Sequence, residues 1–196
     1  MRTSLLVTVA AVVAATTASV AYAMVLLPAG ATVSLSGSTY ASDSSLGGTI
    51  EDDRVLSFDC SDGSGTLKGT LQTRIVRNGL GELDFYYRVT NDASSDAGIS
   101  QVSARKFPES KPGNQDGVWV DFRPDGDGDV GPKTAHRSDD GTVVDFMFSE
   151  NNHVEPGHSS LFMFVRPSLG GHDDNGVTTI IDGVRTCAVA NTLQPL

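Results

Sequence analysis

Three carboxylates stand at alternate positions in one glycine-rich segment of the chain. Asp125, Asp127 and Asp129 are separated by Gly126 and Gly128, and the glycines would let the backbone curl so that the carboxylates converge on a hard cation such as calcium. The segment does not fit the EF-hand loop, which needs a glycine at its sixth position and a glutamate at its twelfth. The spacing therefore predicts at most a structural calcium site. The alternative is a solvated turn, because Asp and Gly both favour turns.

Histidine and serine residues occur at spacings that superficially resemble catalytic motifs. His153 and His158 flank Pro156 and Gly157, which prevent the helix that aligns two metal ligands in a zinc protease. Ser159 follows His158 but lacks the fifth-position glycine and the strand-to-helix turn of a nucleophile elbow. We therefore expect no catalytic residue here. The sequence does not exclude a glycosidase pair of carboxylates, because the distance between the two groups is a property of the fold.

Aromatic residues are candidates for stacking against sugar rings, which present an apolar face. The mature chain offers Tyr40, Tyr86, Tyr87 and Trp119. Alternation along its strand places Tyr86 on the outward face, so we expect it to be the best ligand-binding aromatic residue. Trp119 is the second candidate, and packing in the core or against a sheet face is its alternative.

The chain has two cysteines, Cys60 and Cys187. An even number of cysteines in an exported protein favours a disulfide, and two separate buried thiols are the alternative. A bond between them would tie an early part of the fold to its last strand. Neither cysteine has a second cysteine or a histidine at zinc-ligand spacing, so we expect no zinc site there.

The first residues have the composition of a secretory signal peptide. Arg2 precedes an apolar, alanine-rich stretch, and Ala21-Tyr22-Ala23 matches the pattern at which signal peptidase cuts. An uncleaved membrane anchor is the alternative. We expect residues 1–23 to be a signal peptide with a helical apolar part. Residues 24–196 should then form one secreted domain, outside the cell or in the periplasm.

Charge narrows the range of partners. The formal net charge is −10, from 14 basic and 24 acidic residues, and loss of Arg2 with the signal peptide leaves −11. Such a surface repels nucleic acid and anionic membranes. Cations and neutral or basic polymers are compatible with it. Solubility of a secreted domain is a sufficient explanation for the acidity.

Strand signals run through the whole mature chain. The clearest is Glu82–Asn91, where Leu83, Phe85, Tyr87 and Val89 alternate with polar residues, as in a half-buried antiparallel strand. A second strand contains Leu67, Leu71 and Ile75, and others are expected at Thr32–Ser36, Arg54–Cys60, Ile99–Phe107, Val118–Phe122, Thr142–Phe148, Ser160–Arg166, Val177–Ile181 and Val184–Ala190. About ten short strands with turn signals every 8–12 residues predict a single all-β domain. We expect an antiparallel β-sandwich of jelly-roll or immunoglobulin-like type.

The dipeptide Asn78-Gly79 predicts a hairpin between the strand signals on either side of it. A two-residue loop would pair Ile75 with Glu82 and set the apolar faces out of phase, whereas a loop one residue longer pairs Ile75 with Leu83. A slip by one residue turns every side chain to the other face. We therefore expect an odd-length loop or a glycine bulge.

Six segments of the mature chain form an ordered set: Leu26–Gly30, Leu35–Gly37, Gly81–Asp92, Arg137–Phe146, Val154–Ser160 and Ile180–Gly183. In this order they resemble the extracellular body of bacterial PEP-CTERM proteins, which exosortase sorts. The resemblance implies export and a β-rich body, often in bacteria that make exopolysaccharide, and it supplies no catalytic residues. The given sequence ends at Leu196 without a Pro-Glu-Pro motif, a membrane helix or a basic tail, so we expect free secretion without this C-terminal anchor.

Together these features favour a secreted, non-enzymatic β-sandwich with a structural or adhesive role at the cell surface or in the extracellular matrix. Extracellular polysaccharide or surface proteins are the expected partners. One alternative is a carbohydrate-binding module, which needs an exposed aromatic row near Tyr86 or Trp119. Another is an enzyme acting on extracellular polysaccharide, which needs two carboxylates facing each other in a cleft. We expect no cofactor beyond a structural calcium ion, no nucleic acid partner, and no membrane contact after signal cleavage.

Overall fold

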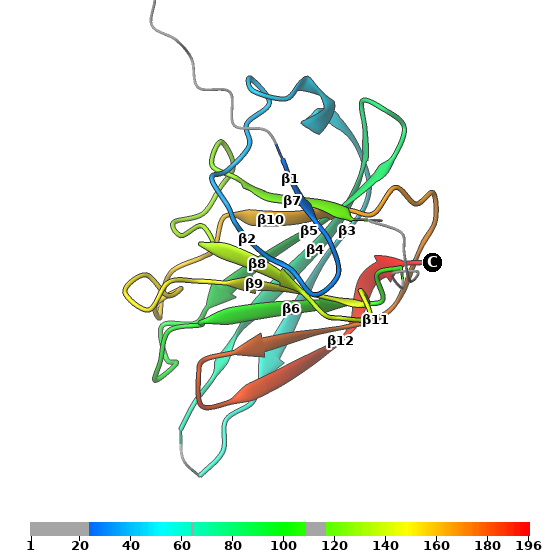
Figure 1. Cartoon of the computed structure of the whole chain (residues 1–196). Helices are drawn as coiled ribbons and strands as arrows, with labels where there is room; N and C mark the ends of the chain where they lie inside the picture. Colours follow the sequence, from blue (N-terminus) through cyan, green and yellow to red (C-terminus); the bar gives the residue numbers. More distant parts are fainter. Residues whose placement is uncertain (1–23, 64, 109–116) are drawn as a thin grey trace, which may run out of the picture.

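Two antiparallel sheets of six strands pack face to face and form a β-sandwich (Figure 1). This computed structural model describes residues 24–63, 65–108 and 117–196, so the expected signal peptide lies outside the described residues. The only helical element in these ranges is one 3-10 turn, η1 (Ser44–Leu46). The all-β, antiparallel sandwich expected from the sequence is confirmed.

Sheet A has the strand order β1-β7-β10-β5-β4-β3. The bounds of these strands are β1 (Val25–Leu27), β7 (Val118–Arg123), β10 (Phe162–Arg166), β5 (Leu83–Asn91), β4 (Lys68–Asn78) and β3 (Gly48–Asp59). Sheet B has the order β12-β11-β6-β9-β8-β2. Its strands are β12 (Thr186–Pro195), β11 (His172–Ile181), β6 (Gln101–Arg105), β9 (Val143–Met147), β8 (Thr134–Arg137) and β2 (Thr32–Ser34).

The inward faces of both sheets form one apolar cluster. In sheet A, the alternate residues Phe85, Tyr87 and Val89 of β5 pack there with Leu71 and Ile75 of β4, and each is at most 1% exposed. The alternation read from the sequence therefore placed the correct face of β5 inward. Burial of this apolar surface is the main stabilising contribution to such a fold.

The hairpin between β4 and β5 has a three-residue loop at 79–81, because the backbone N–H of Asn78 donates to the carbonyl of Glu82. The expected odd length is confirmed. The expected pairing is wrong by two residues, since Ile75 lies opposite Phe85 and not opposite Leu83. The loop has the expected three residues but begins one residue later, and the side-chain oxygen of Asn78 accepts from the N–H groups of Leu80 and Glu82 across it, at 2.9 and 3.1 Å. A shift by two residues keeps the apolar faces in phase.

A disulfide joins Cys60, directly after β3, to Cys187 in β12, with the two Cα atoms 5.6 Å apart. The predicted pairing is confirmed. Because the bond links an edge strand of sheet A to an edge strand of sheet B, it holds the two sheets together on one side of the sandwich. Its loop spans 127 residues of sequence, and closing a loop of that length removes much entropy from the unfolded chain.

A connection that we name the strap, residues 36–47, leaves β2 in sheet B and crosses to sheet A before β3 begins. Figure 1 shows it in blue to teal at the top of the molecule. The strap contains η1, whose Leu46 is 3% exposed and packs in a second apolar cluster with Val76, Tyr86, Phe162 and Phe164. These four residues belong to sheet A, so the strap covers part of the outer face of that sheet.

The described part of the chain contains no helix of the length and apolarity needed to span a membrane.

Candidate functional site

The outer face of sheet A carries rows of aromatic and charged side chains across its strands. One row runs Asp121, Phe164, Tyr86, Arg74 and Asp53, in which each residue lies opposite the next on the neighbouring strand. Directly paired side chains on one face of a sheet are close enough to interact. This face is therefore neither a uniform apolar surface nor a plain solvated one, and its rings and charges meet at short range.

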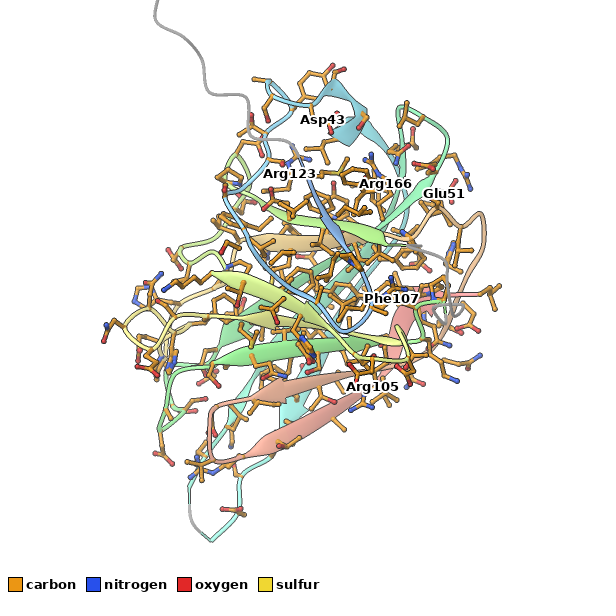
Figure 2. The ribbon with its side chains drawn as sticks, in the orientation of Figure 1. Asp43, Glu51, Arg105, Phe107, Arg123 and Arg166 are labelled. Atoms are coloured by element: carbon orange, nitrogen blue, oxygen red, sulfur yellow. A yellow bond between two sulfur atoms is a disulfide. The ribbon has the colours of Figure 1, made fainter. Side chains whose placement is uncertain are left out.

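The strap covers one part of this face and is held there by buried polar groups. Asp121, fully buried, accepts from the N–H of Gly37 at 2.9 Å and from the hydroxyl of Ser38 at 2.8 Å. Arg166 donates to the buried carboxylate of Asp84 at 2.5 and 2.8 Å and to the hydroxyl of Ser45 at 3.0 Å. Figure 2 shows Arg166 and Arg123 on the side of the molecule where Asp43 of the strap lies. These bonds fix the strap to the sheet.

The part of the face beside the strap is open and forms a pocket of about 390 Å³. Its lining comes from the strap, from β3, β4, β5, β7 and β10, and from the loop after β7. The lining residues used below are Leu46, Gly48, Arg74, Tyr86, Arg123, Asp125, Asp127 and Phe162. The volume lies within the range typical of small-molecule sites. The described residues thus place charged and aromatic groups around one cavity on a rigid sheet.

Tyr86 lies on the outward face of β5 as predicted, but it is covered and only 4% exposed. Its ring packs against Phe162 and Phe164, with centroids 6.1 and 5.2 Å away. Burial raises the pKa of its hydroxyl to about 12. The guanidinium of Arg123 lies beside that hydroxyl, yet the oxygen is buried without a hydrogen bond of good geometry. Tyr86 is therefore part of the pocket wall and not the exposed stacking surface that the sequence suggested.

Two guanidinium groups lie against the ring of Phe162. The Cζ atom of Arg74 is 4.8 Å from the ring centroid and that of Arg88 is 4.9 Å away, both within the range of a cation–π interaction. Arg123 lies directly opposite Phe162 on β7. The aromatic ring thus holds two planar hydrogen-bond donors in place, and a third lies on the neighbouring strand.

Each of these arginines has a carboxylate partner. Arg74 donates to Asp53 at 2.6 Å, and Arg123 donates to Asp125 at 2.8 and 3.0 Å. Arg88 approaches the carboxylate of Asp127 to 3.9 Å, a distance too long for a hydrogen bond. Four of these six charged residues line the pocket, whereas Arg88 and Asp53 lie beside it and contact lining residues. One of the three pairs, Arg88 with Asp127, is loose. The six residues of these pairs are named the arginine–aspartate set below.

Tyr40 of the strap adjoins this pocket without being one of its lining residues, and 56% of its surface is exposed. Its backbone N–H donates to Asp125 at 3.0 Å. Its ring lies over Gly47, between the lining residues Leu46 and Gly48, so that a Cβ atom at position 47 would stand 2.6 Å from Tyr40 Cε2. The missing side chain at Gly47 leaves space for an aromatic ring at the rim of the pocket.

Two carboxylates of the arginine–aspartate set, Asp53 and Asp125, are held in their ionised form. Hydrogen bonds from Arg123 lower the pKa of Asp125. Partial burial by itself would raise the pKa of Asp53, but hydrogen bonds from Arg74 and Gln72 outweigh it and the pKa is lowered. Such groups accept hydrogen bonds at neutral pH and do not deliver protons.

The predicted calcium ligands are neighbours in sequence but bind different partners. Asp125 is held by Arg123, the side chain of Asp127 is 95% exposed, and Asp129 accepts from the backbone N–H of Ser159 at 2.9 Å. The structure therefore does not bring the three carboxylates together. Throughout the described residues, no group of three or more His, Cys, Asp or Glu side chains could hold a metal ion.

Trp119, the second predicted ligand-binding aromatic residue, lies on β7 and is 40% exposed. Its neighbour across the strands, Leu26, is 38% exposed, and neither residue lines the pocket. His158 stands 3.4 Å from Asp129, while the hydroxyl of Ser159 bonds to that of Thr90 at 2.8 Å. Of the aromatic residues that the sequence offered for sugar binding, Tyr40 and Trp119 have exposed rings. Of these two, only Tyr40 adjoins the pocket.

Sequence reasoning missed the arginine–aspartate set as a site. The available signal was the outward position of Arg74 and Arg88 on two strands predicted to be neighbours. Finding the site also required the true hairpin register, which places Arg74 opposite Tyr86, and the position of β10, which follows β5 by more than 70 residues. Comparison with known proteins adds no assignment: no protein family, no curated protein and no solved structure matches the chain significantly.

Proposed function

We propose that this chain is an exported, non-enzymatic β-sandwich that acts as an adhesive protein by binding saccharide at the cell surface or in the extracellular matrix. The observation that carries the proposal is the pocket on the outer face of sheet A, with the exposed ring of Tyr40 at its rim. Sugar recognition combines an aromatic ring, which packs on the apolar face of the sugar, with directed polar groups. The arginine–aspartate set supplies those polar groups.

The protonation states of the carboxylates favour binding over hydrolysis. A glycosidase needs a general acid whose pKa is raised, but the pKa values of Asp53 and Asp125 are lowered. Burial raises the pKa values of Asp84 and Asp121. Both of these side chains are fully buried, bonded to Arg166 and to the strap. The raised carboxylates thus have structural partners, and the carboxylates with lowered pKa values line the pocket or pair with its arginines.

Export is the second part of the proposal. The signal-peptide pattern ending at Ala23 and the disulfide between Cys60 and Cys187 support it, since disulfides persist in oxidising compartments. The resemblance to the extracellular body of PEP-CTERM proteins agrees with this location. N-terminal sequencing of the exported protein should find Met24 first, and recovery of Arg2 would contradict cleavage.

The saccharide proposal is tested with a glycan array probed with oxidised protein spanning residues 24–196. We expect binding at micromolar to millimolar concentration, and loss of about tenfold or more in affinity in Tyr40→Ala, with partial retention in Tyr40→Phe. Trp119→Ala is the matched control, because it removes an exposed ring of the same sheet outside the pocket. Absence of binding to every glycan at millimolar concentration would overturn the proposal, and release of reducing ends from a bound glycan would overturn its non-enzymatic part.

A further inference from the structure

The hydrogen-bonding capacity of the arginine–aspartate set is unevenly used. The guanidinium of Arg74 donates through Nε and Nη2 to one oxygen of Asp53, and that of Arg123 uses Nε and Nη2 on Asp125 and Nη1 on the carbonyl of Leu46. The guanidinium of Arg88 makes no hydrogen bond to any described residue, and its ion pair with Asp127 spans 3.9 Å. Arg88 and Asp127 are therefore the donor and the acceptor most available to a ligand.

Arg88 and Asp127 differ in how firmly they are placed. The side chain of Arg88 is 25% exposed, and its guanidinium carbon lies 4.9 Å from the centroid of Phe162, so the ring restricts its orientation. Asp127 belongs to the loop after β7 and its side chain is 95% exposed. The adjacent Asp125 is held by Arg123 and by the strap, which anchors the loop next to the pocket. The pair is thus a fixed donor facing a freely accessible acceptor.

We propose that the pocket binds a neutral sugar ring, and that two adjacent hydroxyl groups of that ring are recognised by Asp127, which lines the pocket, and by Arg88, which lies at its edge against Phe162. One hydroxyl accepts from Arg88 and the other donates to Asp127. The two hydroxyls can also form a hydrogen bond with each other between these side chains. This inference rests on the proposed saccharide binding and names its ligand class. A diol suits the pair because each hydroxyl both donates and accepts, whereas a carboxylate only accepts.

Charge balance supports a neutral ligand. The arginine–aspartate set has three positive and three negative groups, so it offers no net attraction to an anion. The whole chain carries a formal charge of −10, which repels an acidic polymer. A sugar with a carboxylate would meet the lining residues Asp125 and Asp127 at close range. A neutral sugar avoids that repulsion and still gains charge-assisted hydrogen bonds.

The experiment compares matched saccharides by isothermal titration calorimetry. The probes are tetrasaccharides of glucose, galactose and mannose, each beside the uronate tetrasaccharide of the same linkage, which differs by the carboxylate at C6. With the oxidised protein we expect at least one neutral tetrasaccharide to bind about tenfold or more tightly than its uronate counterpart. Asp127→Asn should weaken that neutral ligand about tenfold by removing the charged acceptor. Because Asp127 is exposed, the melting temperature of the Asp127→Asn variant should equal that of the wild-type protein.

Arg88→Gln should weaken the neutral ligand by a similar factor. The control is Arg105→Gln, which removes the same charge from an exposed position on β6 of sheet B, away from Arg123 in Figure 2, and should leave affinity unchanged. Tighter binding of a uronate than of its neutral counterpart, or tighter uronate binding in Asp127→Asn with no loss for neutral sugars, would overturn this inference and leave the proposed function standing. Binding of none of the six probes or of any array glycan would overturn both.

Discussion

The two faces of sheet A bury different chemistry. The inner face buries apolar residues such as Leu71, Ile75 and Phe85 in the common core. The outer face buries Phe164 and Tyr86 together with Asp84, Asp121 and Arg166, each at most 4% exposed. Alternation along a strand decides which side chains share a face. Alternation does not decide which segments of the chain cover that face.

The two faces of sheet A should contribute differently to stability and to binding. An apolar face tolerates many packings of similar volume, whereas buried charges need specific partners and geometry. On the outer face the strap supplies those partners, and the part that it leaves open is the pocket. Stability should therefore depend mainly on the core, on the disulfide and on the strap anchors, while binding should depend on the arginine–aspartate set and on Tyr40.

The largest effect on stability should follow removal of the disulfide, which joins the sheets on the core side. The double variant Cys60→Ala/Cys187→Ala frees a loop of 127 residues and should lower the free energy of unfolding by about 5 kcal/mol, as measured by urea denaturation. Saccharide affinity of the folded fraction should not change. A loss of affinity at full folding would show that the pocket depends on the sheet-to-sheet link.

The next largest effect should come from the covered part of the outer face. Arg166→Met leaves the carboxylate of Asp84 buried without its partner and should cost about 3–5 kcal/mol of unfolding free energy. Adding Asp84→Asn removes the stranded charge while keeping a group that can bond to Asn78, so the double variant should recover most of that loss. A double variant as unstable as the single one would mean that Arg166 stabilises the fold by its contact with the strap.

The fold was largely predictable because its signals are local. The alternation in β5, the turn residues between strands and the pair of cysteines each report directly on the structure formed. β1 and β8 were not predicted, since three or four residues carry too little period to recognise. The start of β3, Gly48–Asp53, was also missed, because four of its first six residues are Gly, Glu or Asp, which are depleted in strands.

The site was less predictable because it depends on contacts between distant segments. Tyr86 was correctly placed on the outer face of β5, but its exposure depends on Leu46 and Phe162, which are far away in sequence. The regular spacing of Asp125, Asp127 and Asp129 suggested a shared cation. Asp125 pairs with an arginine two residues before it, Asp127 with Arg88 on another strand, and Asp129 with a backbone N–H thirty residues away. Local spacing could not reveal those partners.

A smaller change in stability should follow Tyr86→Phe, which tests separately how the Tyr86 hydroxyl affects folding and saccharide binding. Its hydroxyl is buried without a well-formed hydrogen bond, and an unpaired buried hydroxyl is unfavourable by about 1–3 kcal/mol. Tyr86→Phe should therefore raise the free energy of unfolding by about 1 kcal/mol in thermal or urea unfolding. If ligand entry lets the hydroxyl find a partner, the same variant should bind saccharide several-fold more weakly. Higher stability with unchanged affinity would exclude Tyr86 from recognition.

The smallest effect on stability should come from Gly47. Its backbone φ of −74° is open to any residue, so Gly47→Ala introduces no backbone strain, and the reduced freedom of the unfolded chain favours the folded state by about 0.4–1 kcal/mol. The new Cβ would stand 2.6 Å from Tyr40 Cε2, and the exposed ring must move aside. Unfolding should therefore change by less than about 1 kcal/mol, while saccharide affinity falls roughly threefold to tenfold. Gly170→Ala is the control, because a Cβ there meets no atom within 4 Å. Unchanged affinity in Gly47→Ala, beside a strong loss in Tyr40→Ala, would show that the ring contributes without needing its position over Gly47.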